Sequence, residues 1–259
     1  LLTSITPNFV ERVELNDYKV NHSLANMIAE NLNRIKGETV LDLDSSGDLN
    51  MDEYIAHEIN TKAKIPNMDF DMFDDEDEIT GLDVYLVLDC SLSMHTAGNQ
   101  LRNIAGTIFE ALTKCDFITF KTVCYSGSFD RELYVQKITR ADQISSIVAD
   151  RKHRGTCTDL ALNYVNSDIE KNGSDNRKNL VILFTDGLPE DDLSFDEMQK
   201  SISQEIVKMK NQDISFFTLY YENISYYNSA GYSSRIDEIK TQMKNIFRNS
   251  IYVTRDFDD

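Results

Sequence analysis

Short apolar runs alternate with amphipathic helical patterns from residue 84 onward, and this alternation constrains the fold more than any other feature of the chain. The runs cover Val84–Leu88, Leu180–Phe184 and Ile214–Tyr220, the last interrupted by a serine and a threonine. Apolar runs of this length, rich in β-branched and aromatic residues, are typical of strands buried on both faces of a parallel sheet. Residues 117–123 and 131–136 are more mixed strand candidates, and we expect the second to form a short edge strand.

Apolar side chains between these strands recur at three- and four-residue steps, which is the periodicity of amphipathic helices. The four stripes contain Leu101, Ile104, Ala105, Ile108 and Leu112; Leu160, Ala161, Tyr164, Val165 and Ile169; Met198, Ile202, Ile206 and Met209; and Ile236, Ile239, Met243 and Ile246. A capping box from Ser194 to Glu197 is expected to open the third helix. The alternation predicts an α/β fold, in which helices cover both faces of a doubly wound, mainly parallel sheet.

The chain before residue 81 has a different character. Its first apolar stripe, formed by Leu24, Met27, Ile28, Leu32 and Ile35, predicts a helix that ends at Gly37. A second short helix is expected over Asp52–Lys62, before Pro66. We therefore divide the chain into a helical N-terminal section at 1–66, an acidic linker at 67–80 and an α/β domain at 81–259.

Acidic side chains dominate the 259 residues, with 44 Asp and Glu against 26 Lys and Arg and a formal net charge of −18. Residues 42–78 hold 13 of these acids and only two lysines, and residues 69–78 read DFDMFDDEDE. Like charges at this density stay solvated, so 69–78 is interpreted as a linker or flexible edge, most simply a solvated spacer. The alternative is a docking strip that steers a basic protein partner. A chain this acidic is a poor binder of nucleic acid or of anionic membranes.

The sequence favours a cytoplasmic protein. Its four cysteines, Cys90, Cys115, Cys124 and Cys157, form no C-x-x-C pair and are interpreted as buried thiols in a reducing compartment. No apolar run approaches the roughly 18 residues that a membrane-spanning helix needs. No basic-then-apolar leader opens the numbered chain, although it begins with Leu1 and not Met.

Polar residues gather where the predicted sheet would bind a ligand, beyond the carboxyl ends of its strands. Asp89-Cys90-Ser91-Leu92-Ser93 follows one strand, Thr185-Asp186-Gly187 follows another, and Gly155-Thr156-Cys157-Thr158 precedes a helix. Carboxylates and hydroxyls are hard oxygen ligands, which suit Mg²⁺ or Mn²⁺ and not Zn²⁺. We expect the hydroxyls of Ser91, Ser93 and Thr156 to bind the ion directly, and Asp89 and Asp186 to bind it directly or through water.

These motifs resemble the von Willebrand factor A domain and its metal-ion-dependent adhesion site. The resemblance rests on DCSLS at 89–93, GTCT at 155–158 and FTDG at 184–187, and covers roughly residues 80–256. It implies that Asp89, Ser91, Ser93, Thr156 and Asp186 coordinate the metal and that a partner's Asp or Glu completes the shell. Leu92 departs from relatives that often carry Gly there. The structural alternative is that these are turn and helix-cap residues.

A narrower resemblance is to intracellular proteins near the CobT subunit of cobaltochelatase and the NorD-type proteins. It rests on GDLNMDEYIAHEI at 47–59, the acidic stretch, GLDVYLVLDCSLSM and FTDGLPEDD. In that group the domain works beside a MoxR- or CobS-type AAA+ ATPase. The resemblance implies a protein-binding module that is not catalytic alone, although it could be a non-catalytic subunit of a metal chelatase.

Two further functions remain open at this stage. Residues 42–53 fit an EF-hand calcium loop, with candidate ligands Asp42, Asp44, Ser46, Asp48, Asn50 and Glu53. Against a Ca²⁺ site, the preceding helix is predicted to end at Gly37 and no second loop is visible; the alternative is a helix-capping turn. An extracellular, integrin-like adhesion domain would use the glycosylation sequons at Asn21-His22-Ser23 and Asn223-Ile224-Ser225.

The chain lacks the motifs of two large enzyme classes. It contains neither G-x-S-x-G nor G-x-x-x-x-G-K-[ST], which argues against a serine hydrolase or an ATPase in this polypeptide.

Overall fold

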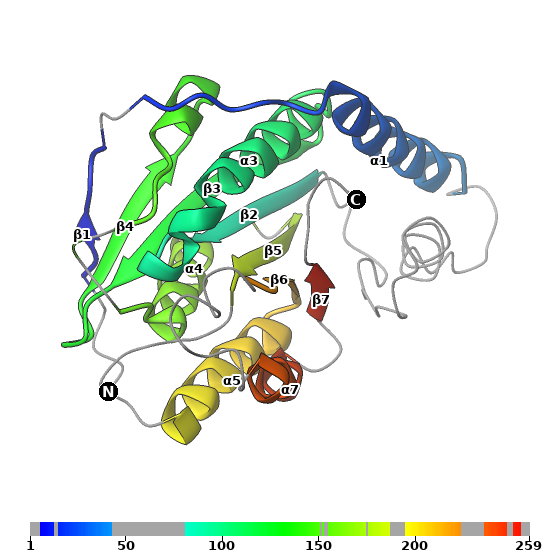
Figure 1. Ribbon diagram of the computed structural model, residues 1–259. Helices are drawn as coiled ribbons and strands as arrows, with labels where there is room; N and C mark the ends of the chain where they lie inside the picture. Colours follow the sequence, from blue (N-terminus) through cyan, green and yellow to red (C-terminus); the bar gives the residue numbers. More distant parts are fainter. Residues whose placement is uncertain are drawn as a thin grey trace.

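The protein has a central sheet with helices on both faces (Figure 1). The computed structural model describes residues 6–12, 15–42, 81–150, 152, 155–174, 176–186, 195–223, 236–247 and 251–254. Within these residues the sheet has the strand order β1-β4-β3-β2-β5-β6-β7. The strands are β1 (Asn8–Phe9), β2 (Gly81–Asp89), β3 (Ile118–Gly127), β4 (Leu133–Ile138), β5 (Arg177–Thr185), β6 (Ile214–Tyr221) and β7 (Ile251–Thr254).

The sheet is mainly parallel, as predicted. All of its neighbouring pairs run parallel except β3 and β4, which form an antiparallel hairpin. Every residue of β2 is buried, because β3 and β5 flank this strand and helices cover both of its faces. The apolar run at Val84–Leu88 is therefore the centre of the sheet, which explains why it lacks the alternation of a half-exposed strand.

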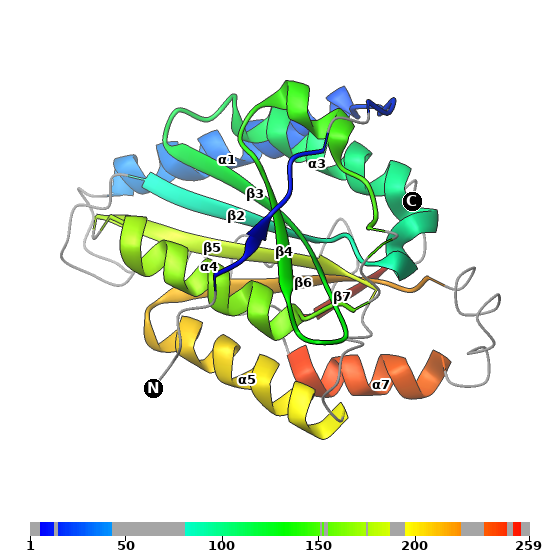
Figure 2. The same cartoon turned by 90° about the vertical axis from the view of Figure 1, so that its left-hand side faces the viewer.

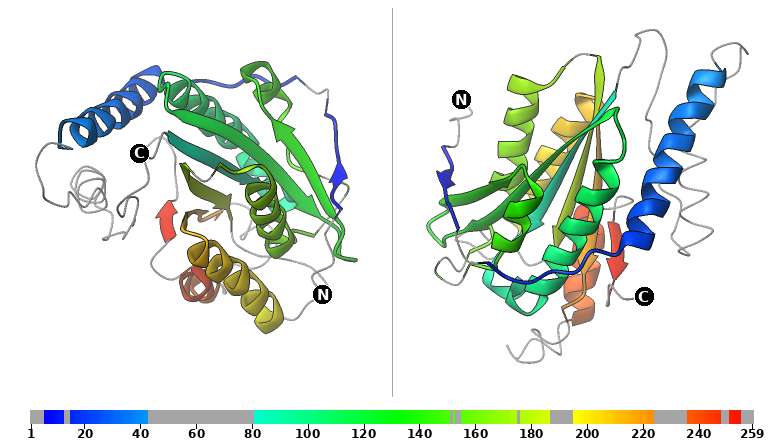
Figure 3. Two further views of the ribbon diagram at one scale, coloured as in Figure 1. Left: turned by 180° about the vertical axis from the view of Figure 1, so that it is seen from behind. Right: turned by 90° about the horizontal axis from the view of Figure 1, so that it is seen from above.

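The sheet separates the core into two layers, each covered by helices, as Figures 1 and 3 show. The helical segments are α1 (His22–Asp42), η1 (Leu92–Ala97), α3 (Gly98–Leu112), η2 (Ala141–Ser146), α4 (Thr158–Asn172), α5 (Phe195–Asn211) and α7 (Ile236–Phe247). One cluster joins α4, α5 and α7 to the sheet through buried side chains such as Val165, Ile202 and Met243. The opposite cluster joins α3 to the other face through Leu101 and Ala105. The predicted doubly wound α/β fold is confirmed.

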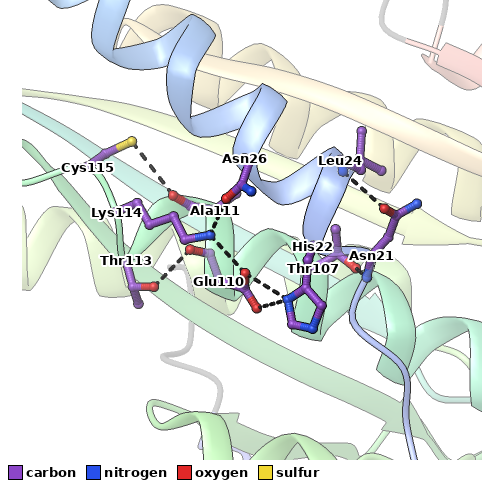
Figure 4. A network of polar contacts seen from close by, with 10 residues as sticks. All are labelled: Asn21, His22, Leu24, Asn26, Thr107, Glu110, Ala111, Thr113, Lys114 and Cys115. Atoms are coloured by element: carbon purple, nitrogen blue, oxygen red, sulfur yellow. Dashed lines mark hydrogen bonds and ion pairs between the residues drawn. The ribbon is translucent and has the colours of Figure 1, made fainter.

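The N-terminal section packs directly on this core. β1 pairs with β4 at the edge of the sheet, where Figure 2 shows it beside the hairpin. α1 lies alongside α3, and the polar contacts between them are drawn in Figure 4. The His22 ring lies 2.9 Å from a Glu110 carboxylate oxygen, and the Lys114 ammonium donates to the Asn26 side chain at 2.6 Å. Leu32 packs on the cluster that contains Leu82, Val84 and Leu112.

Two expectations about local structure are wrong. α1 continues through Gly37 to Asp42, because a glycine inside a helix costs only about 1 kcal/mol and does not by itself end the helix. β4 is not the edge strand, because β1 pairs along its outer side. A two-residue strand is too short to produce a detectable sequence pattern. The expected helix at 52–62, the acidic linker and Ser194 of the capping box lie outside the described residues.

Cys90, Cys115, Cys124 and Cys157 are free and buried, as expected for thiols. Among the described residues, no helix combines the length and the hydrophobicity required to cross a membrane.

Candidate metal centre

Three neighbouring parallel strands end at the same edge of the sheet, and each is followed by polar residues. β2, β5 and β6 lie side by side in that order. Their last residues are Asp89, Thr185 and Tyr221, and the register pairs Leu88 with Phe184 and Thr185 with Tyr220. The parallel register therefore brings the polar segments that follow these strands to one place, as the general rule for open α/β sheets predicts.

Asp89 is fixed at both of its carboxylate oxygens. The Ser91 backbone N–H donates to Oδ1 at 2.9 Å, and the Thr185 hydroxyl donates to Oδ2 at 2.7 Å. The side chain has no exposed surface. Burial raises the pKa of the Asp89 carboxyl above its usual value, although the hydrogen bonds from Thr185 and Ser91 act in the opposite direction. A buried carboxylate in this setting is a strong attractor of positive charge.

A chain of hydroxyl contacts connects β2 with β5. The hydroxyl oxygens of Ser91 and Ser93 lie 3.1 Å apart, and the Ser93 hydroxyl donates to Asp186 Oδ1 at 2.9 Å. Asp186 is 1% exposed and Ser91 is 2% exposed, whereas Ser93 is only partly buried. Four of the five predicted ligands thus form one hydrogen-bonded group, whose surface toward solvent is at Ser93.

Thr156 reaches the same edge through a loop that is held to the end of β3. Gly155 exchanges two backbone hydrogen bonds with Gly127, of 2.9 and 2.8 Å. Cys157, the next residue after Thr156, adopts a left-handed conformation with φ of 46° and precedes α4. Thr156 is 3% exposed. This backbone pairing explains why a threonine far from the other ligands in sequence lies at the edge where they gather.

Tyr125 adds a further link between this loop and Asp89. It is the register partner of Asp89 on β3, and its hydroxyl lies 3.0 Å from the Thr158 hydroxyl. Burial raises the pKa of Tyr125 well above its usual value, and the negative charge of Asp89 acts in the same direction. Tyr125 therefore stays neutral and supports the β3 side of the site as a hydrogen-bonding group.

Asn223 is a site residue that the search for metal ligands missed. It follows β6 and has no exposed surface. Its amide nitrogen donates to the Ser93 carbonyl at 2.8 Å and to Asp186 Oδ2 at 3.2 Å. Its position three residues past the end of a predicted strand was the available signal, because the same rule had located Asp89 and Asp186. The sequence had indicated Asn223 only as a glycosylation sequon.

The EF-hand candidate can be placed only at its first position. Asp42 is the last residue of α1, so the helix leads directly into the proposed loop and the objection based on a helix end at Gly37 is wrong. Asp44, Ser46, Asp48, Asn50 and Glu53 lie outside the described residues.

The oxygen donors at the strand ends fit a hard divalent cation. Two carboxylates and three hydroxyls are available, which matches the oxygen ligands and partial hydration that Mg²⁺ prefers. No three His, Cys, Asp or Glu side chains gather into a metal-binding group within the part of the chain that the structure describes. A cation at this edge would therefore depend on the serine and threonine hydroxyls as well as on Asp89 and Asp186.

Comparison with protein families gives one match, the von Willebrand factor type A domain, over residues 83–258. No curated protein sequence matches the chain. The matched segment contains all five predicted ligands.

Several solved structures are similar to this chain at low sequence identity. The pilus adhesin SpaC from Lactobacillus rhamnosus GG, in its open conformation, is 13% identical with a TM-score of 0.50; the match covers 72% of this chain and 29% of the adhesin. The manganese-loaded TRAP protein of Plasmodium vivax is 14% identical with a TM-score of 0.41, covering 68% of this chain and 69% of that one. BatB from Bacteroides thetaiotaomicron is 15% identical with a TM-score of 0.41, covering 55% and 67%. The chain thus spans under a third of the adhesin.

Proposed function

The chain belongs to the von Willebrand factor type A domain family, and from this premise we propose that it is a protein-binding module that depends on a divalent cation. The observation that carries the proposal is the hydrogen-bonded group formed by Asp89, Ser91, Ser93 and Asp186 at the carboxyl edge of the sheet. Turn and cap residues would explain each motif separately, but they would not require four oxygen-bearing side chains to converge.

Asp89, Ser91, Ser93, Thr156 and Asp186 would hold Mg²⁺ or Mn²⁺. When bound, the cation would supply a positive charge and a coordination position for a carboxylate of the partner. The chain's own residues prepare this position: Thr185 and the Ser91 backbone orient Asp89, and Ser93 orients Asp186. Hydroxyls carry no charge, so a set with only two carboxylates leaves the ion attractive to a third.

Net charge gives a physical reason for metal dependence. The chain carries −18, so it repels an approaching aspartate or glutamate over roughly a Debye length, about 8 Å at physiological salt. A divalent cation at the edge of the sheet would offset the charges of Asp89 and Asp186 and present a positive centre at its open coordination position. Binding of an acidic partner residue should therefore require the ion, whereas the rest of the surface favours a basic partner.

The proposed partner is a MoxR- or CobS-type AAA+ ATPase or its client. This proposal rests on the resemblance of residues 47–59, GLDVYLVLDCSLSM and FTDGLPEDD to the CobT/NorD-type proteins. In this proposal the protein acts in the cytoplasm and is not catalytic alone. In a cobaltochelatase-like complex it would be a non-catalytic subunit. Co-purification with an ATPase, abolished by EDTA, would support this partner. Recovery of the same ATPase in excess EDTA would contradict a metal bridge.

The integrin-like alternative loses part of its support in the structure. Asn223, the acceptor of the second sequon, is fully buried and its amide is engaged with Ser93 and Asp186. A glycan on that amide is incompatible with the fold. Asn21, in the first sequon, is exposed and its side-chain oxygen accepts from the Leu24 N–H at 3.0 Å, which caps α1.

Calorimetric titration with Mg²⁺ tests the metal site before any partner is known. Asp186→Asn removes one charge without changing the shape of the side chain, and we expect Mg²⁺ affinity to fall by more than about tenfold. Asp83→Asn is the matched control, because Asp83 is a buried carboxylate at the opposite end of β2, paired with Arg177 at 2.6 Å. Equal Mg²⁺ affinity in the wild type and Asp186→Asn would contradict the proposal.

A further inference from the structure

Asn223 connects three elements at the edge of the sheet. Asn223 lies just past β6 and accepts a hydrogen bond from the Thr96 hydroxyl of η1 at 3.2 Å. Its amide nitrogen donates to Asp186, which follows β5, and to the Ser93 carbonyl. Its side chain is completely buried. A buried carboxamide bonded on both of its ends is held in one orientation, because turning it over would place like polar atoms against each other.

The chemistry of the neighbours determines which end of the amide faces which group. The Ser93 carbonyl can only accept, so the Asn223 atom 2.8 Å away is the Nδ2 donor. Oδ1 then receives the Thr96 hydroxyl. The same Nδ2 group also donates to Asp186 Oδ2 at 3.2 Å. The two oxygens of Asp186 are therefore distinguished: Oδ2 faces the Asn223 amide, and Oδ1 faces the Ser93 hydroxyl at 2.9 Å.

We propose that Asn223 is a specificity-determining positioning residue, which turns one oxygen of Asp186 away from the cation and so favours Mg²⁺ over Ca²⁺. This inference rests on the metal site proposed above. Ca²⁺ takes roughly six to eight oxygen ligands and often binds both oxygens of one carboxylate. Mg²⁺ takes about six oxygen ligands in a stricter octahedral arrangement. A carboxylate that is restricted to one oxygen suits the smaller ion.

The neutrality of the Asn223 amide matters as much as its shape. A lysine or arginine in this place would neutralise the Asp186 carboxylate by ion pairing. The neutral amide of Asn223 holds Asp186 Oδ2 and leaves the carboxylate charge in place. Asp186 thus retains its negative charge for the cation while losing its freedom to rotate. The link through Thr96 also ties η1, which carries Ser93, to the end of β6.

Competition for Mn²⁺ tests the inference on the full chain. The metal-stripped protein is titrated with Mn²⁺, whose free form is measured by electron paramagnetic resonance, and bound Mn²⁺ is then displaced with Mg²⁺ or Ca²⁺. Asn223→Ala frees Oδ2, so we expect Mg²⁺ affinity to fall by roughly tenfold with a smaller loss for Ca²⁺. The ratio of the two affinities should shift toward Ca²⁺ by about fivefold or more.

Asn166→Ala is the matched control. Asn166 is also fully buried, and its amide donates to a carboxylate oxygen and the carbonyl of Glu205 on α5, at 2.7 and 3.3 Å. The two substitutions remove the same kind of group, but Asn166 lies on α4 and joins two helices. Both variants should lose thermal stability, whereas only Asn223→Ala should change the ratio of Mg²⁺ to Ca²⁺ affinity.

Thr96→Val gives a second, milder test in case Asn223→Ala fails to fold. It removes the donor that fixes the amide and leaves Asn223 in place, so the ratio should shift in the same direction by a smaller factor. An unchanged ratio in both folded variants, or an equal shift in Asn166→Ala, would overturn the inference while leaving the metal site intact. Wild-type protein that binds neither Mn²⁺ nor Mg²⁺ would overturn the proposed function and this inference together.

Discussion

Asp168 on α4 shows how a single carboxylate can join a helix to the sheet. The Lys121 ammonium lies 3.2 Å from it and the Lys137 ammonium 3.6 Å, and the Tyr85 hydroxyl donates to it at 3.1 Å. Burial alone would raise the pKa of Asp168, but the two lysines and the hydroxyl outweigh burial and lower the pKa below its usual value. The ionised carboxylate is therefore more favourable in the folded protein than in the unfolded chain.

The sign of the resulting pH dependence follows from linkage. Because the folded-state pKa of Asp168 is lowered, its contribution to stability is present above the unfolded pKa and is lost as pH falls through the folded one. We expect Asp168→Asn to reduce the free energy of unfolding by about 1–2 kcal/mol at pH 7. The difference from wild type should shrink below about pH 4, near the unfolded pKa of an aspartate.

Urea denaturation at pH 7 and at pH 3 measures this dependence. Asp142→Asn is the control, because the Asp142–Arg140 pair has both side chains more than two-thirds exposed and should contribute under about 0.5 kcal/mol. A destabilisation by Asp168→Asn that is the same at both pH values would contradict the assignment.

At the scale of elements, the loop that carries Thr156 depends on a tight fit between β3 and α4. A Cβ atom on Gly127 would lie 2.5 Å from the Cys157 sulfur and 2.8 Å from its Cβ. Cys157 itself has φ of 46°, which costs a non-glycine residue roughly 1 kcal/mol. Glycine at 127 is therefore required by the close approach of the loop, and the loop in turn places Thr156.

A double substitution separates the two effects. Gly127→Ala should displace the loop, destabilise the protein by about 1–3 kcal/mol and weaken Mg²⁺ binding. Cys157→Gly alone should be neutral or slightly stabilising, because it relieves the left-handed conformation, although it deletes a buried side chain. The double variant should recover Mg²⁺ affinity relative to Gly127→Ala, since the obstructing sulfur is gone. Calorimetric titration with Mg²⁺ measures the affinities of the wild type, the two single variants and the double variant. If the losses of Mg²⁺ affinity in the two single variants simply add in the double variant, the cause is not steric.

The elements that the sequence predicts best are those with the strongest periodicity. The apolar run at Val84–Leu88 became the fully buried β2, and the stripe from Leu101 to Leu112 became the buried face of α3. β1 and β7 escaped prediction because strands of two and four residues carry almost no pattern. Their pairing is decided by the neighbouring strand, which is a tertiary effect.

The convergence of the proposed metal ligands was predictable for a different reason. Asp89, Ser91, Ser93 and Asp186 stand directly after strands, so topology alone brings them together. Asn223 was not identified, because an asparagine after a strand is also typical of a turn, and only the register of β6 against β5 shows that it meets Asp186.

At the scale of the whole molecule, the N-terminal section covers part of the core. Leu32 packs on Leu82, Val84 and Leu112, and the Arg102 side chain on α3 donates to the Asp17 carbonyl at 3.3 Å. Arg102 is itself 6% exposed. Removal of the section would expose these apolar side chains and leave the buried guanidinium with one acceptor fewer.

A chain that begins at residue 80 tests how far the α/β domain is independent. We expect its melting temperature to lie roughly 5 °C or more below that of the full chain, because burial of even one leucine contributes about 2 kcal/mol. Leu15→Ala in the full chain is the control, since Leu15 is 81% exposed and its loss should change little. Equal melting temperatures for the shortened and full chains would show that the predicted boundary at residue 81 separates an independent domain.

The central claim is that five oxygen-bearing side chains hold one hard cation at the carboxyl edge of the sheet. Crystals grown with Mn²⁺ test it directly, because anomalous scattering locates manganese without assumptions about its ligands. The account predicts a peak about 2.1–2.3 Å from the hydroxyl oxygens of Ser91, Ser93 and Thr156, with Asp89 and Asp186 bound directly or through one water. A peak elsewhere in the chain, with no density at this edge in the presence of saturating Mn²⁺, would contradict it.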